Sequence, residues 1–242
     1  VAALQGDALV LGGRSAADKS AWLLFLDGKD AVLGQYAVKV GDAAAVAVVL
    51  PLGGGQVLAV GQTTKAAGKE AVTGVLLLRA NAQGVVATAS AGGADVSLAA
   101  SHAIAMGPTQ VAVGGRRWTG AGASQVMLAL LNYNGKITWQ RGLADAPASG
   151  ALAGLASLPD GGYLVAANVL GKADAVLPTV FRTAPSGSAV WQWQLKDNNA
   201  YPHGRLAAMV ARPDGSVGLV GRLGGPGSPA NVLASGLVHP GG

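Results

Sequence analysis

Short apolar runs separated by glycine-rich turns form the main pattern of this sequence. The runs are four to eight residues long, and Gly, Pro, Asn or Asp stands at their ends. Runs of this length with such boundaries are typical of β-strands and hairpins. No stretch sustains the helical spacing of apolar residues, so the pattern predicts an all-β protein.

One apolar run recurs along the whole chain. The copies are GDALVLGGR (6–14), GGQVLAVGQ (54–62), PTQVAVGGR (108–116), GGYLVAAN (161–168) and GSVGLVGR (215–222). Each copy closes on a small residue, and these residues are Gly12, Gly61, Gly114, Ala167 and Gly221. They follow one another at intervals of 49, 53, 53 and 54 residues. A period of about 50 residues is the length of a propeller blade.

Each copy predicts an antiparallel unit of up to four strands, A to D. The second copy contains all four, at 44–50, 57–60, 75–78 and 85–89. The recurring run is strand B, and Gly12-Gly13 is expected to form its exit turn. Further strands are expected at 103–106, 152–158 and 206–211 (A), 22–26 and 126–131 (C), and 31–38, 136–140 and 189–195 (D). Asp160-Gly161 and Asp214-Gly215 provide turns between A and B, because glycine accepts positive φ.

The copies resemble the blades of bacterial β-propeller repeat proteins. The resemblance lies in Asp160–Val165 (DGGYLV) and Asn134–Trp139 (NGKITW), and the Gly-Gly endings are similar to the kelch repeat. It implies an all-β, five-bladed β-propeller of four-stranded antiparallel blades, in an extracytoplasmic location that is periplasmic, secreted or cell surface. We expect a single domain over residues 1–242, with blades at about 1–40, 41–91, 92–142, 143–196 and 197–242.

The last copy is expected to lack its outer strand. It stops at 239–242, where its turn from strand C to strand D is expected, and Val1–Gln5 provides only a shortened strand A for the first copy. An open sheet edge accepts a further strand by β-augmentation. We therefore expect residues upstream of Val1, or a strand donated by a partner, to complete this blade. A larger ring with further blades is the alternative.

Composition and charge narrow the possible partners. Half of the residues are apolar, 12% are charged and 38 are glycine, as in a well-buried β protein with many turns. The net charge of +5 comes from scattered basic residues, and the densest run is Arg116-Arg117. Because a nucleic-acid groove shows a basic stripe with aromatic residues, we expect no nucleic-acid partner. The longest apolar stretch, Ala43–Leu52, is shorter than the roughly 18 residues that suggest a membrane span.

Polar residues at repeat positions are the candidate binding residues. The ends of strand B carry Arg14, Gln62, Arg116, Asn168 and Arg222, and the loops from D to A carry Asp42, Asp95, Asp145 and Asp197. Their regularity favours Arg-Asp pairs between neighbouring blades. A polar ring that binds a ligand, sugar or cation is the alternative. Arg117 and Trp118 follow Arg116 in a glycine-rich loop, and both residue types are typical interface anchors.

No catalytic or cofactor site emerges from the remaining residues. Cysteine is absent, which excludes thiol chemistry, and His102 and His203 are expected near the channel without a second metal ligand. Glu70 is expected in a solvated loop, and a calcium loop is suggested only by the fragment Asp197-Asn198-Asn199. Trp191 and Trp193 alternate along a strand and are expected to pack against the next blade. We expect no cofactor and no metal.

The function that this sequence favours is a non-catalytic binding or interaction module with a protein or glycan ligand. The main alternative is a carbohydrate-active hydrolase with Asp residues at the channel mouth, which needs two carboxyl groups about 5 to 9.5 Å apart. A structural cassette of a larger surface protein is a third reading.

Overall fold

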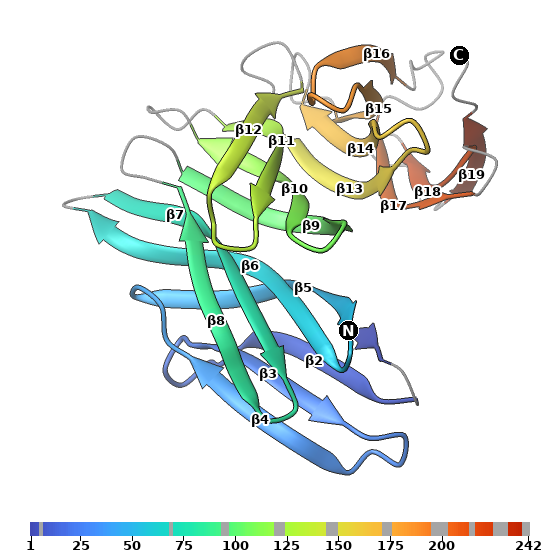
Figure 1. The fold of residues 1–242 in the computed structure, drawn as a ribbon. Helices are drawn as coiled ribbons and strands as arrows, with labels where there is room; N and C mark the ends of the chain where they lie inside the picture. The colour runs from blue at the N-terminus through green and yellow to red at the C-terminus, as the bar shows by residue number, and fades with distance from the viewer. Residues whose placement is uncertain are drawn as a thin grey trace. The chain divides into compact units, whose positions relative to one another are not determined.

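The computed structural model describes residues 1–4, 7–67, 70–92, 97–118, 124–143, 150–170, 176–194, 203–212, 216–224 and 232–238. The regular elements in these ranges are all β-strands (Figure 1). Within them, no helix is long and apolar enough to cross a membrane.

The strands form five sheets in which sequence neighbours pair. The first sheet contains β1 (Ala2–Ala3), β2 (Leu9–Arg14), β3 (Ala21–Leu26) and β4 (Val32–Val38). The second contains β5 (Ala43–Gly53), β6 (Gln56–Ala67), β7 (Glu70–Asn81) and β8 (Gly84–Ala91). The third contains β9 (Ser97–Met106), β10 (Gln110–Trp118), β11 (Ser124–Asn132) and β12 (Ile137–Gly142). The fourth contains β13 (Gly150–Ser157), β14 (Tyr163–Leu170), β15 (Val176–Thr183) and β16 (Ala189–Gln194). The fifth contains β17 (His203–Ala211), β18 (Val217–Gly224) and β19 (Val232–Val238).

This is the organisation of a five-bladed β-propeller whose last blade lacks its outer strand in the described residues, as the sequence predicts. The shortened first strand is also confirmed, because β1 pairs with β2 over two residues. The packing separates two compact units, Val1–Gly122 with Ala129–Thr138 and Ala123–Leu128 with Trp139–Gly242, so their boundary passes through the third sheet. The single domain over residues 1–242 stays a prediction.

Several strands are longer than the apolar runs that predict them. β6 continues past Gly61 to Ala67, and Thr63, Thr64 and Lys65 pair with β7. Polar residues extend this hairpin because each strand pairs through its backbone whichever side chains it carries. Glu70 is therefore the first residue of β7, and the expectation that it lies in a loop is wrong.

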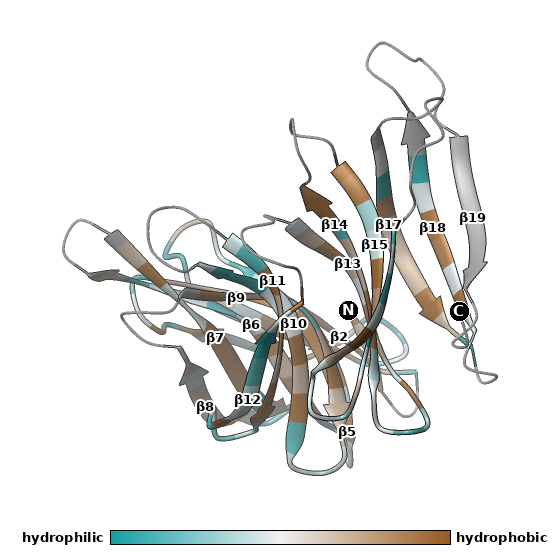
Figure 2. Ribbon diagram, turned by 90° about the horizontal axis from the view of Figure 1, so that it is seen from above, coloured by the Kyte–Doolittle hydropathy of each residue, from teal (hydrophilic) through white to brown (hydrophobic). Residues whose placement is uncertain are grey.

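The core of the first unit lies between the first and second sheets. Alternation along β3 buries Ala21, Leu23 and Phe25, and these join Val57 and Leu76 in one cluster. Phe25 also contacts Tyr36 edge to face, at 6.1 Å between ring centroids. Full burial of each such side chain contributes about 1.5 to 3 kcal/mol. Hydrophobic and hydrophilic residues also lie on different strands of the third sheet. Figure 2 shows hydrophobic residues along β10 and hydrophilic ones on β12.

The second unit has its own cluster, formed by the fourth and fifth sheets. Leu164, Ala166 and Val180 pack with Val217 and Leu219. Trp191 of β16 lies against this cluster, as do Leu206 and Met209 of β17. Neighbouring sheets are therefore joined face to face through apolar side chains, as expected for packed blades.

A β-bulge recurs in the first strand of the last four sheets. A register shift at this point of each strand leaves one residue without a partner, at Ala47, Ser101, Ala153 and Ala207. These positions are 54, 52 and 54 residues apart, as are the residues opposite the bulges, which are Gly61, Gly115, Ala167 and Gly221. The equivalent residue in the third sheet is therefore Gly115, whereas the spacing of the sequence repeats selects Gly114, one position earlier.

Close approach of the first strand explains the glycines of the repeat. A Cβ atom on Gly61 would lie 1.8 Å from the carbonyl oxygen of Ala45, and one on Gly115 would lie 1.9 Å from that of Ala99. Gly12 and Gly13 lie within β2, so their predicted exit turn is wrong. A Cβ on Gly12 would lie 2.6 Å from Val46 Cγ1. These glycines provide space for neighbouring atoms inside a strand.

We predict that Gly221→Ala destabilises the protein by roughly 2 to 3 kcal/mol, because the added methyl overpacks the site. Its Cβ would lie 2.5 Å from the carbonyl oxygen of Arg205. Gly218→Ala in the same strand is the matched control, because a Cβ atom there would lie 3.8 Å from its nearest neighbour, the carbonyl oxygen of Val210. Denaturant unfolding measures both variants. Equal stabilities would contradict the steric explanation.

Candidate functional site

The predicted binding arginines lie within strands. Arg14 is the exposed last residue of β2, and Arg222 is exposed in β18. Arg116, Arg117 and Trp118 are the half-buried last three residues of β10. Trp118 therefore belongs to a strand, and its predicted exposed loop setting is wrong. Its backbone pairs with Ser97 across the sheet, which fixes the end of β10.

The four arginines form no ion pair with any acidic side chain that the structure describes. The ion pair found in those ranges joins Arg182 to Asp160. The Nε atom of Arg117 is buried without a hydrogen-bond partner. A buried guanidinium nitrogen without an acceptor is energetically unfavourable. The end of β10 therefore contains a buried donor that the described residues leave unsatisfied.

Asp42 is held by the backbone of its own sheet. Its Oδ2 accepts a hydrogen bond from the Ala66 amide at 2.6 Å, and its own amide donates to the Thr64 carbonyl at 2.8 Å. The Arg-Asp pair expected of Asp42 is thus replaced by a link between the start of β5 and the end of β6. Asp95, Asp145 and Asp197, with Asn198 and Asn199, lie outside the described residues.

Asn168 joins the fourth sheet to the fifth. Its amide nitrogen donates to the Leu206 carbonyl at 2.8 Å, and its Oδ1 accepts from the Leu206 amide at 2.7 Å. The side chain thereby pairs with the backbone of β17 as a neighbouring strand would. Gln62, at the equivalent position of β6, is exposed. Blade joining, which the sequence assigns to Arg-Asp pairs, is performed here by an amide.

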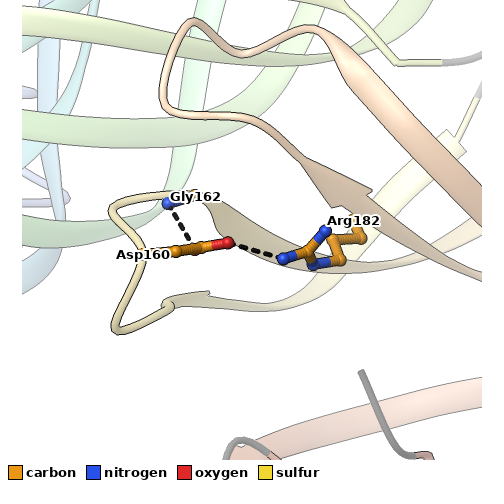
Figure 3. Close-up of polar contacts among 3 residues, drawn as sticks. All are labelled: Asp160, Gly162 and Arg182. Carbon is orange, nitrogen blue, oxygen red and sulfur yellow. Dashed lines mark hydrogen bonds and ion pairs between the residues drawn. The ribbon is translucent and has the colours of Figure 1, made fainter. Parts of the chain in front are cut away.

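The other described aspartates with hydrogen bonds organise turns. Asp27 accepts from the amides of Lys29 and Ala31 at 2.8 and 2.9 Å. Asp160 accepts from the Gly162 amide at 3.0 Å and contacts Arg182 at 2.5 Å (Figure 3). This agrees with the turn role that the sequence assigns to these acids. None of these interactions pairs two carboxylates.

The loop after β2 contains Asp18, a residue whose pKa is lowered by its neighbours. Hydrogen bonds from the side chains of Ser15 and Ser20 lower the pKa of Asp18 to about 2. Its Oδ1 accepts from both the amide and the hydroxyl of Ser20, at 3.1 and 2.7 Å. Donors to a carboxylate favour its ionised form. Asp18 is thus a fixed anion that shapes this exposed loop.

Histidine and tryptophan positions agree with structural roles. His102 is half-buried in β9, and its Nδ1 lies 3.1 Å from Ser101 Oγ. His203 begins β17. Across the described ranges, no three His, Asp or Glu side chains gather as a metal site would require. Trp191 packs on the apolar cluster of the second unit as predicted, whereas Trp193 is 39% exposed.

Comparisons with known proteins support the fold alone. No protein-family model matches the chain, and no curated protein matches it. The α-L-arabinanase of Penicillium chrysogenum, solved with arabinobiose, has a TM-score of 0.58 at 9% identity over 91% of this chain and 75% of its own. AofleA from Arthrobotrys oligospora, in a variant with three arginines replaced by alanine, has a TM-score of 0.52 at 14% identity over 99% and 68%. A europium-containing methanol dehydrogenase has a TM-score of 0.50 at 14% identity over 91% and 47%.

We predict that Asn168→Ala lowers the free energy of unfolding by about 2 kcal/mol, because it removes two hydrogen bonds and leaves backbone groups of Leu206 unpaired. Gln62→Ala, at the equivalent exposed position, is expected to change the free energy of unfolding by less than about 0.5 kcal/mol. Thermal and urea unfolding measure the difference. A similar loss in both variants would show that the amide does not join the sheets.

The Asp18 carboxylate is expected to titrate near pH 2. Its pKa is lowered on folding, so its contribution to the loop is present above the ordinary value of 3.8 and is lost as the pH falls through about 2. Ser15→Ala removes a donor and is expected to raise the midpoint, whereas the remote Ser186→Ala leaves it unchanged. An NMR titration of the Asp18 side-chain carbon measures this midpoint. A wild-type midpoint at 3.8 would refute the assignment.

Proposed function

We propose that this protein is a non-catalytic binding module that recognises a protein or glycan partner through residues at the ends of the second strands of its sheets. The residues proposed to contact the partner are Arg14, Arg116, Arg117, Trp118 and Arg222. The acidic residues proposed to take part in binding are Asp42, Asp95, Asp145 and Asp197.

One contrast between charges carries this proposal. The described aspartates with hydrogen bonds use them within turns or on neighbouring backbone, whereas Arg14, Arg116, Arg117 and Arg222 have no acidic partner in the described residues. Acids that are engaged in turns are poorly placed for general acid and base catalysis. Arginines without partners, beside a tryptophan, are typical of recognition surfaces.

A saccharide is one partner class that this fold accommodates, since the arabinanase of the same fold was solved with arabinobiose. We propose an extracytoplasmic location on the resemblance to bacterial propeller repeats. The competing hydrolase would require two carboxyl groups about 5 to 9.5 Å apart.

The test combines binding with turnover. We expect the wild-type protein to bind one or more members of a glycan and protein array, and to release no reducing sugar from arabinan or other polysaccharides. Replacing Arg116, Arg117 and Trp118 together by alanine should weaken binding at least about tenfold, as loss of interface anchors does. Arg141→Ala with Arg212→Ala, two exposed arginines, is the control.

Turnover would overturn the proposal. If a polysaccharide is hydrolysed, and Asp95→Asn, Asp145→Asn or Asp197→Asn abolishes the hydrolysis, the protein is a carbohydrate-active enzyme. Binding that the triple variant retains in full would instead remove the end of β10 from the site.

A further inference from the structure

Four basic residues from separate segments gather on the first two sheets. We call them the basic platform: Arg14 at the end of β2, Lys19 in the loop before β3, Lys39 in the connection before β5, and Lys65 in β6. All four side chains are exposed. The sequence gives little indication of this group, because its members are isolated along the chain and only Arg14 ends a repeat.

Backbone hydrogen bonds bring these segments together. The Lys19 carbonyl accepts from the Ala44 amide at 2.8 Å, which ties the loop after β2 to the start of β5. The Asp42 amide then donates to the Thr64 carbonyl at 2.8 Å, which ties the same connection to β6 beside Lys65. The three segments that carry the lysines are therefore linked through fixed backbone.

Local packing fixes how the connection before β5 is oriented and how closely it approaches β6. Val38 and Val40 pack against the core of the first unit, so the intervening Lys39 is turned out and is exposed. Gly41 has a φ of 67°, and a Cβ atom there would lie 2.6 Å from the Thr64 carbonyl oxygen. Only glycine permits this approach without strain. The backbone that carries the platform is thus organised before any partner binds.

The segments that carry the platform have a net positive charge. Residues 14–20, 39–42 and 64–66 contain four cations and two acids, Asp18 and Asp42, so their formal charge is +2. Both acids accept hydrogen bonds from local backbone amides, and neither forms an ion pair with a described residue. Exposed cations without partners attract an acidic molecule and steer its approach.

We propose that the basic platform binds an acidic polypeptide segment, rich in Glu or Asp, of a partner protein. The proposal rests on the proposed function, since it names a partner for the site that includes Arg14. Three of the four cations are lysines, which act as flexible point charges for separate carboxylates rather than as planar clamps for sulfate or phosphate. The segments 15–20, 39–42 and 64–66 contain no aromatic residue on which a sugar ring could stack.

The test uses a fluorescently labelled oligoglutamate peptide as the probe. Lys19→Gln, Lys39→Gln and Lys65→Gln combined should weaken its binding about tenfold at low salt, and the wild-type affinity should fall as salt is added. Lys29→Gln, Lys136→Gln and Arg141→Gln combined form the control, since they remove the same charge from other exposed positions. This control should change binding less than twofold. Urea unfolding of both variants verifies that they are folded.

Three results would overturn the inference. The first is that oligoglutamate does not bind. The second is an equal loss of affinity in the two variants, which would indicate an effect of net charge alone. The third is tighter platform-dependent binding of a polyuronate, which would make the ligand a polysaccharide. In each case the proposed function survives if the array ligand still binds in a manner that depends on Arg116, Arg117 and Trp118. Hydrolysis of a glycan would instead remove the proposed function.

Discussion

The close approach of the first and second strands in the second, third and fifth sheets is the contact on which this architecture depends. A bulge in the first strand brings a carbonyl oxygen to within 1.8 Å of where a Cβ of Gly61 would lie, and to within 1.9 Å of where one of Gly115 would lie. At Gly61 and Gly115 a residue without a side chain is needed for this approach, whereas the fourth sheet has Ala167 at the equivalent position. The same bulge period of 54, 52 and 54 residues sets the repeat of the sheets.

A second recurring contact joins the outer strand of one sheet to a turn of the next. In the first unit the Tyr36 hydroxyl donates to the Ala82 carbonyl, and Gly135 lies where a Cβ would be 2.9 Å from the Ser90 carbonyl oxygen. In the second unit, Trp139 contacts Tyr163 edge to face at 5.8 Å, and Gly187 leaves room for its ring. Aromatic residues and turn glycines thus complement each other across neighbouring sheets.

The fold can be predicted from the sequence because the residues that produce it recur at a fixed period. Turn residues and apolar runs recur at blade length, and the sheets follow them. The site is less predictable, because a repeat position shows that a residue recurs but not what it contacts. Asn168 and Gln62 occupy equivalent positions, yet only Asn168 is seen to bind the backbone of the next sheet. Strand ends are also missed at β6 and β10, since polar residues extend the ladders there.

The distribution of charge over this framework argues for recognition rather than chemistry. Turns need carboxylates that accept backbone amides, and Asp18, Asp27, Asp42 and Asp160 meet that need. Lysine and arginine cannot accept these bonds, so the framework has little structural use for them. Basic side chains that form no ion pair with a described acid lie at the ends of strands and in exposed connections. The four arginines at the strand ends form no ion pair with a described acid, and this contrast supports the proposal of a partner with accessible carboxylates.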